Sequence, residues 1–522
     1  MNTARHRACR ASATLSRARG PMTARRAIAT NHFIHRGTLL PPFPRLLSRH
    51  SPGTQTSNSY TETDVTPPKP GSGFTFAVKD NIATHGSPTT CASSALKDYE
   101  SPVEATIVTQ LRARGGVPVG KTNMDEFGMG SHSANSAAGP VLNPNFAEPR
   151  SAGGSSGGSA VAVRLGDADL ALGTDTGGSV RLPAAYTGVV GYKPSYGMVS
   201  RWGVVPYANS LDTVGFLARD VDRIYDLVIG TGLMNEHDEN DPTSLSKATR
   251  ARCAQNTPPN TFKDPSQITI GIPQDYRIAE LHPSILAAWA AAEEALKQWG
   301  ARVVPVQLPT TQAALPAYYV LAPAEASSNL AKYDGVRYGA REPESDAGVL
   351  YSSTRGSGLG AEVRRRILVG TYSLSSSAMD NYFVQAQRVR RLVQRDFDAV
   401  FRLPNPLRDE EPFDLSEMED GVVLEDKKGP PQVDFLLCPT APGLPPRMED
   451  VKKQTPVDSY MNDVFTVPAS LAGLPAVSVP VPVEGEVEET GGVAGMQLVG
   501  QFWDDARVLA LARELARLMP VG

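Results

Sequence analysis

Hydrophobic residues recur along the chain in short segments that alternate between two patterns. In residues 103–116 (VEATIVTQLRARGG), Val103, Ile107 and Leu111 fall on one face of a helix that ends at two glycines, and the VPVGKT that follows predicts a short strand. The segment 282–309 has the same order of helix, glycine and strand. Helices that alternate with strands in this way predict an α/β fold around a mixed sheet, without internal repeats.

The composition is that of a soluble globular protein. With 522 residues, 41% hydrophobic and 20% charged, the chain can bury one large core or two ordinary ones. It has no run of about 18 or more uncharged apolar residues, so no membrane-spanning helix is expected. The four cysteines lack the spacing of a zinc site or a disulfide framework, which favours a reducing compartment and no structural metal.

The first 50 residues differ in charge from the rest of the chain. They hold ten arginines, no lysine and no acidic residue, a composition typical of a mitochondrial transit peptide. We predict a disordered transit peptide at 1–50, a polar linker at 51–73 and one folded domain at 74–522. A basic arm that binds nucleic acid is the alternative for the first segment. The remaining 41 basic and 55 acidic residues leave a net charge of −14, which disfavours general binding of polyphosphates.

A second block of charge interrupts the domain near its C-terminal third. The stretch DEEPFDLSEMEDGVVLED contains nine acids, and we predict an acidic surface insertion at about 408–430. Such a segment is most simply a solvated loop, so we assign it no chemistry.

Two short motifs suggest functions that their surroundings disfavour. Gly115–Thr122 (GGVPVGKT) matches the phosphate-loop pattern, but a helix precedes it and Val-Pro-Val occupies the part that should be a flexible loop. Gly153–Gly157 (GGSSG) matches a nucleophile elbow, which needs a histidine later in the chain to activate its serine. Only His237 and His282 follow, in a polar turn and at an expected helix start, so this hypothesis is the weaker one.

A serine activated by a group other than histidine fits the same region better. Gly-Gly-Ser occurs twice, at 153–155 and at 177–179, and the first copy opens a helical stretch whose N-terminus favours developing negative charge. The second copy follows LALGTDT, which predicts a buried strand, and its glycines allow consecutive N–H groups to point at one spot. Each pair of glycines could be only a tight turn, but two copies that both present a serine are hard to explain as a linker.

These residues resemble the amidase signature family. The family pattern GGSSGGS, followed by G-T-D-x-G-G-S-[IV]-R-x-P, occurs here with Ser155 and Ser179 24 positions apart, and its V-K-D-N element stands at Val78–Asn81. The resemblance extends from Phe74 to the C-terminal helix. It implies a single large domain with a central mixed sheet covered by helices on both faces.

The resemblance also implies a Ser-Ser-Lys triad. Ser179 would attack a carboxamide carbon, Ser155 would relay its proton and Lys79 would be the final base. The family holds the relay serine through a cis peptide, here Gly154–Ser155, at a cost of about 3–4 kcal/mol. The implied oxyanion hole consists of the backbone N–H groups of four consecutive residues, Thr176, Gly177, Gly178 and Ser179.

Lys79 can accept a proton at neutral pH only if its neutral form is favoured. Its ordinary pKa near 10.4 must fall by about 3 units, and burial would have to cause this. The apolar strand FTFAVKDNI supplies burial, and strand alternation should direct Asp80 to the opposite face. A core lysine paired with a carboxylate is the alternative interpretation of this residue.

Other segments indicate which substrate the triad would act on. Residues 121–144, 200–220, 317–339 and 364–375 resemble the glutamine-using branch of the family, the A-type subunits of the glutamyl-tRNA(Gln) amidotransferases. By that resemblance, free glutamine would be bound by three side chains, Tyr318, Arg366 and Asp463. An arginine suits the α-carboxylate and a carboxylate suits the α-ammonium group. Taken alone, Arg366 could equally be an arginine on a helix surface, and Asp463 could be a helix N-cap.

The same resemblance implies the wider reaction. The chain would hydrolyse glutamine and pass ammonia to a B-type kinase subunit that uses ATP and Mg²⁺ to amidate Glu-tRNA(Gln), with a small third subunit, in the mitochondrial matrix. This chain would bind no cofactor or metal itself and would contact the tRNA only indirectly. It departs from bacterial-type members, which carry a longer helical segment before the lysine, and this puts any partner contact made there in doubt. The alternatives are a free-standing amidase for small or lipid amides and an inactive scaffold subunit.

Overall fold

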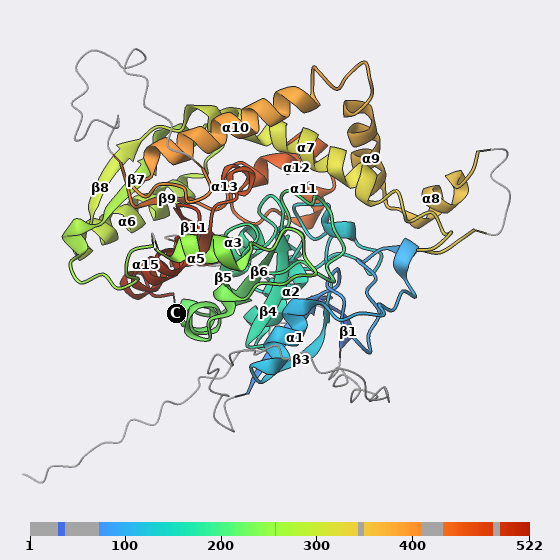
Figure 1. Ribbon diagram of the computed structural model, residues 1–522, viewed down its shortest axis with the longest axis horizontal. Helices are drawn as coiled ribbons and strands as arrows, with labels where there is room; N and C mark the ends of the chain where they lie inside the picture. The colour runs from blue at the N-terminus through green and yellow to red at the C-terminus, as the bar shows by residue number, and fades with distance from the viewer. Residues whose placement is uncertain are drawn as a thin grey trace, which may run out of the picture.

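The computed structural model describes residues 30–36, 73–255, 257–342, 349–408, 432–483 and 491–521. Eleven strands form one sheet in the order β1-β3-β2-β4-β6-β5-β10-β11-β9-β7-β8 (Figure 1). The strands are β1 (Phe33–Arg36), β2 (Phe74–Lys79), β3 (Gly116–Thr122), β4 (Leu170–Asp175), β5 (Val190–Lys193), β6 (Thr213–Ala218), β7 (Thr269–Pro273), β8 (Arg302–Val306), β9 (Phe435–Pro439), β10 (Ala476–Pro482) and β11 (Val493–Gly500). Strand β2 runs parallel to β3 and β4, whereas β10 is antiparallel to β5 and β11, so the expectation of a mixed sheet is confirmed.

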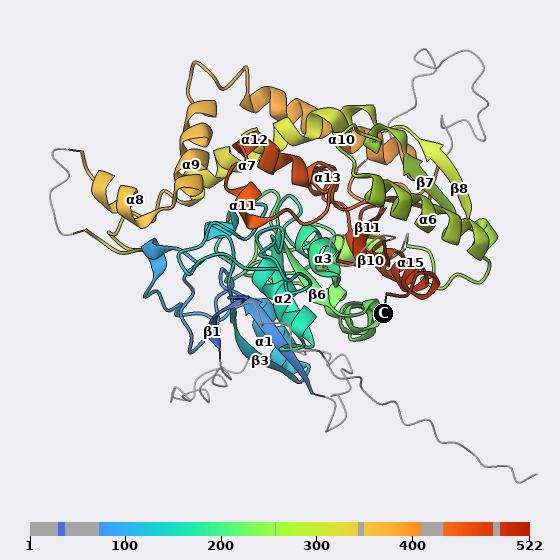
Figure 2. The same cartoon turned by 180° about the vertical axis from the view of Figure 1, so that it is seen from behind.

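Helices cover both faces of this sheet. They are α1 (Thr106–Ala113), α2 (Gly157–Leu165), α3 (Arg181–Thr187), α4 (Val221–Tyr225), α5 (Lys247–Gln255), α6 (Pro283–Trp299), α7 (Ala314–Asn329), α8 (Ser352–Gly358), α9 (Ala361–Ser373), α10 (Phe383–Val400), α11 (Met448–Val451), α12 (Pro456–Tyr460), α13 (Val467–Ala472) and α15 (Asp505–Leu518). On β11, Gly495 lies against Ala185 of α3, and Gly500 lies against Val508 of α15. The two glycines are an odd number of positions apart on the strand, so α3 and α15 pack on opposite faces. Figure 2 shows α2 beside α3, with which it is in contact.

The two helix–strand units expected from the hydrophobic pattern are present. Helix α1 buries Ile107 and Leu111, as expected, but it begins only at Thr106, so Val103 lies outside it and is exposed. Helix α6 begins at a proline and ends at Gly300, whose φ of 110° is a conformation that favours glycine. A strand follows each helix: β3 runs parallel to β2, and β8 runs parallel to β7.

A short strand from the expected transit peptide belongs to the folded domain. Strand β1 pairs antiparallel with β3 at the edge of the sheet. His32 and Arg36 each lie 2.7 Å from a carboxylate oxygen of Asp167, and the carbonyl oxygen of His32 accepts a hydrogen bond from the N–H of Asn123. For residues 30–36 the expectation of disorder is therefore wrong. The rest of 1–50, the linker apart from Gly73 and the acidic insertion beyond Arg408 lie outside the described residues.

The sequence that resembles a phosphate loop is strand β3 itself. Lys121 Nζ lies 3.5 Å from Asp80 Oδ1 and donates to the carbonyl oxygen of Ile82 at 2.6 Å, and both charged side chains are fully buried. Lys121 therefore closes a buried ion pair between neighbouring strands and has no loop in which to hold a phosphate.

We expect Lys121→Met to lower the free energy of unfolding by about 3–5 kcal/mol, because it leaves the carboxylate of Asp80 buried without its partner. Urea denaturation measures the change, and Lys97→Met, at an exposed lysine, is the matched control. A loss no larger than that of the control would contradict a structural role for the pair.

Candidate active site

Lys79 is the last residue of β2 and lies at the centre of a buried cluster of hydroxyl groups. Its Nζ atom is 2.8 Å from Ser155 Oγ, 2.8 Å from Ser156 Oγ and 2.9 Å from Thr174 Oγ1. The side chain is fully buried. These contacts are hydroxyl oxygens rather than a carboxylate, which argues against the interpretation as a core lysine in an ion pair.

Burial lowers the pKa of Lys79 to about 7. The carboxylates of Asp125 and Asp175 oppose this shift but do not overcome it. Asp80 does not contribute, because it faces Lys121, as strand alternation predicts. A substantial fraction of Lys79 is therefore neutral at physiological pH and able to accept a proton.

The two Gly-Gly-Ser turns bring Ser155 and Ser179 into contact. The backbone N–H of Ser155 donates to Ser179 Oγ at 3.3 Å, and the N–H of Ser156 donates to the Ser179 carbonyl oxygen at 3.2 Å. A Cβ at Gly154 would lie 2.6 Å from Pro183 Cδ, so this approach requires glycine. The hydroxyl of Ser155 contacts Lys79 and its backbone N–H contacts the Ser179 hydroxyl, so Ser155 lies between Lys79 and Ser179.

The peptide between Gly154 and Ser155 is not cis. Throughout the described residues every peptide bond is trans, so the expected cis bond is absent. The chain turns instead through the left-handed conformations of Gly153 and Gly154, which have φ values of 80° and 50°.

The turn after β4 places backbone N–H groups, which find no hydrogen-bond acceptor in the described part of the chain, beside Ser179. Within the described chain, the N–H groups of Gly177 and Gly178 donate to no protein acceptor, as an oxyanion hole requires. A Cβ at Gly177 would lie 2.6 Å from the ring of Tyr318, and one at Gly178 would collide with Thr466. The turn is thus held between helices α7 and α13.

A buried ion pair holds the ends of this turn. Arg181 Nη2 lies 2.8 Å from Asp175 Oδ1, and neither side chain is exposed. Arg181 also donates to the carbonyl oxygen of Thr466 at 2.9 Å. Because Asp175 precedes the turn and Arg181 follows it, the pair fixes the positions of the N–H groups between them.

The three residues expected to bind glutamine lie together next to the turn. Arg366 of α9 is almost fully buried, and it donates to Glu362 Oε1 and to the hydroxyl of Tyr207, both at 2.8 Å. It is therefore not a surface arginine. Its guanidinium group lies 5.2 Å from the ring centre of Tyr319, which neighbours Tyr318 on α7.

Asp463 is likewise buried and is not a helix N-cap. It is the last residue of the 3₁₀ helix η9 (Met461–Asp463), and its Oδ2 accepts hydrogen bonds from Ser131 Oγ at 2.7 Å and from the hydroxyl of Tyr319 at 3.0 Å. Burial raises its pKa to about 6. Asp463 therefore presents a carboxylate at neutral pH close to Gly178.

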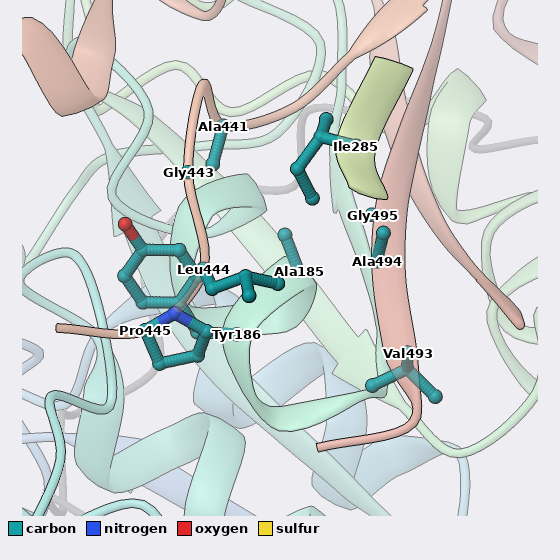
Figure 3. Close-up of a pocket in the computed structure, with 10 residues that line it drawn as sticks. All are labelled: Ala185, Tyr186, Ile285, Ala441, Gly443, Leu444, Pro445, Val493, Ala494 and Gly495. Atoms are coloured by element: carbon teal, nitrogen blue, oxygen red, sulfur yellow. The ribbon is translucent and has the colours of Figure 1, made fainter. Parts of the chain in front are cut away.

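A polar cavity of about 170 Å³ opens beside these residues. Its lining includes Arg366, one of the three residues expected to bind glutamine, and Ser131, which donates a hydrogen bond to a second, Asp463. Figure 3 shows a second hollow of about 10 Å³, with Tyr186, Leu444 and Val493 in its largely apolar wall. This second hollow holds about one water molecule and contains none of the expected site residues.

Several residues of the cluster were missed by the sequence analysis. They are Ser131, Ser156, Thr174, Arg181, Tyr207, Tyr319 and Glu362. Ser156, Thr174 and Arg181 lie within the quoted motifs and could have been found there. The others come from distant segments, so only the fold brings them together.

The histidine-dependent alternative is not supported by the structure. His237 Nδ1 lies 3.3 Å from Ser244 Oγ, and His282 caps α6, so neither histidine approaches Ser155. Among the described residues, no group of three His, Cys, Asp or Glu side chains is placed to hold a metal ion. The described helices also include none that is long and apolar enough to cross a membrane.

Comparisons with known proteins agree with this geometry. The family model described as Amidase matches residues 55–509. The A-type subunit of the mitochondrial glutamyl-tRNA(Gln) amidotransferase of Fusarium vanettenii is 67% identical, over 85% of this chain and 86% of its own, and the protein of the same name from Neurospora crassa is 58% identical, over 85% and 90%. The crystal structure of the A-type glutamyl-tRNA(Gln) amidotransferase subunit from Thermotoga maritima superposes with a TM-score of 0.65 and is 36% identical, covering 86% of this chain and 83% of that one. The chain therefore belongs to the amidase signature family.

Proposed function

We propose that this chain is the glutaminase subunit of a glutamyl-tRNA(Gln) amidotransferase. One observation carries the proposal: the series from buried Lys79 and Ser155 to half-buried Ser179 ends beside a site that holds both a guanidinium group, Arg366, and a carboxylate, Asp463. A free amino acid carries the two complementary charges, whereas a fatty-acid amide carries neither. The names of the similar proteins support the same substrate.

In this proposal Ser179 Oγ attacks the side-chain amide carbon of glutamine. Its proton passes to Ser155, whose own proton moves to neutral Lys79, and the N–H groups of Gly177 and Gly178 stabilise the negative oxygen of the tetrahedral intermediate. The proton returns along the same series to the leaving nitrogen, so ammonia departs and a glutamyl ester of Ser179 remains. Water then hydrolyses the ester by the same steps and releases glutamate.

The proposed recognition of glutamine follows from the two charged side chains of the site. Arg366 would bind the α-carboxylate and Asp463 the α-ammonium group. Tyr318, which lies against Gly177, would pack on the aliphatic part of the substrate next to the reacting carbon. Burial strengthens each charge interaction, because little water competes for these groups.

The remaining parts of the proposal concern the complex. We propose that ammonia passes to a B-type kinase subunit that binds ATP and Mg²⁺ and amidates Glu-tRNA(Gln), together with a small third subunit, in the mitochondrial matrix. This chain would bind no cofactor of its own. The names of the similar proteins specify the mitochondrion and the A-type subunit. They support the assignment of this chain to a mitochondrial complex of several subunits.

Release of ammonia from glutamine tests the proposal. The purified chain is assayed with glutamine, with acetamide and with a long-chain fatty-acid amide, in the presence and absence of the other subunits and Glu-tRNA(Gln). We expect turnover of glutamine that increases in the complex. Turnover of the fatty-acid amide with none of glutamine would instead establish a free-standing amidase.

Arg366→Lys is expected to raise KM for glutamine by about 10–100-fold, because a point charge replaces a fixed planar guanidinium group at a charged hydrogen bond. The change in kcat should be smaller, since Arg366 would contact the α-carboxylate of glutamine and not the side-chain amide that reacts. Arg364→Lys, at an exposed neighbour on α9 that does not line the cavity, is the matched control. Steady-state kinetics measure both values, and an unchanged KM would show that Arg366 does not bind the substrate.

A further inference from the structure

The outer side of helix α9 and the turn that follows it carry a cluster of exposed apolar side chains. Leu368 is 71% exposed and Tyr372, one helical turn later, is 59% exposed. The rings of Tyr372 and Tyr382 lie 5.9 Å apart, which joins the helix to the start of α10. We define the α9 patch as Leu368, Val369, Tyr372, Met379 and Tyr382. In Figure 1, α9 lies past α7 and α10 toward the side of the molecule that ends in α8.

The patch is a local concentration rather than a general property of the surface. Of the eighteen large hydrophobic side chains that are exposed in the described residues, nine lie between Val336 and Tyr382. Single exposed apolar residues are common on proteins, but contiguous ones mark interaction sites. The α9 patch therefore requires an occupant.

The helix that carries the patch is firmly held on its other side. Val363 and Arg366 are buried, and a Cβ at Gly370 would collide with the carbonyl of Pro323 in α7. Because α9 packs this closely on α7, it cannot turn to bury Leu368 and Tyr372. A second molecule is needed to cover them.

The charges around the patch indicate what that molecule carries. Residues 361–391 contain six arginines and only two acids, although the whole chain has a net charge of −4. Arg364 and Arg365 are exposed on α9 itself, and Arg388 is exposed near the start of α10. A second copy of this chain would bring like charges together in a symmetric dimer, which is unfavourable. A partner surface with apolar anchors flanked by Asp or Glu would instead complement the α9 patch and the arginines around it.

We propose that the α9 patch docks another protein subunit of the amidotransferase, through apolar side chains surrounded by acidic residues. This inference rests on the proposed function, which makes the chain one subunit of a complex. It also gives α9 two roles, since the inner side of the helix carries Arg366 at the substrate cavity. The docked subunit would then lie about one helical turn from the group that binds glutamine.

The test is binding of the full chain to the other subunits of the same organism's amidotransferase, purified together. We expect Leu368→Asp/Tyr372→Asp to raise the dissociation constant by about tenfold or more, because the interface loses its central apolar anchors. Leu368→Gln/Tyr372→Gln is a milder pair that should also weaken binding. The matched control is Val117→Asp/Leu286→Asp, which adds the same charges at exposed apolar positions elsewhere. Circular dichroism and thermal melting confirm that each variant is folded.

Each result has a distinct meaning. Weaker binding by both α9 variants, with the control unchanged, supports the proposal. Binding equal to wild type by a folded α9 variant overturns it and leaves the proposed function intact. A wild-type dimer that the α9 variants dissociate overturns it in favour of a second copy. Failure of the wild-type chain to bind the other subunits contradicts its role in a complex, and the docking proposal fails with it.

Discussion

Replacement of Ser179 by alanine is expected to reduce the release of ammonia from glutamine by roughly 10⁴–10⁶-fold, because the reaction loses its nucleophile. The fold should be retained. The Ser179 hydroxyl oxygen accepts a backbone hydrogen bond from Ser155 at 3.3 Å, and the turn is held independently by the ion pair of Asp175 with Arg181. A continuous assay of ammonia measures the loss, and thermal melting confirms that the variant is folded.

Ser376→Ala, at an exposed serine, is the control for this experiment. Mass spectrometry of the wild-type enzyme during turnover adds an independent measurement, since a glutamyl ester on Ser179 increases the mass of one peptide. Activity near wild type in Ser179→Ala would show that the nucleophile has been wrongly assigned. A glutamyl ester found on Ser155 instead of Ser179 would show the same.

The fold was largely predictable because its signals are local. The order of helix, glycine and strand depends on hydrophobic spacing and on the ability of glycine to end a helix, and both are properties of short segments. Strand β1 was missed for the opposite reason. Its residues lie in an arginine-rich, acid-free segment, and only the carboxylate of Asp167 and the free edge of β3 make a strand there favourable.

The candidate site was predictable where its residues share a motif. Ser155, Ser179 and the glycines between them could be identified because each turn needs glycine at a fixed place next to its serine. Ser131 and Tyr319, which hold Asp463, could not be found in this way. They come from other parts of the chain and belong to residue types that occur throughout it, so their role depends on tertiary contacts alone.

The pKa of Lys79 predicts how activity depends on pH. Because burial lowers this pKa to about 7, the lysine is protonated in acid and cannot accept the proton that Ser155 passes on. We expect kcat to rise with pH through about 7 and to level off above it. The carboxylate of Asp463, with a pKa of about 6, must be charged to bind the α-ammonium group, so KM should fall as the pH rises through about 6. The two changes can be separated in assays between about pH 5 and pH 9.

Lys79→Arg tests the same assignment directly. Arginine keeps the positive charge at all these pH values, so the series of hydroxyl groups loses its base, and we expect a loss of roughly 10²–10⁴-fold in kcat at every pH. Burial also raises the pKa of nearby Asp125 to about 7, so this carboxyl group could produce the same rise in kcat. Asp125→Asn separates the two: the rise should remain if Lys79 is the base and should disappear if Asp125 causes it. A Lys79→Arg enzyme that keeps both its activity and its pH dependence would show that the proton of Ser179 leaves by another route.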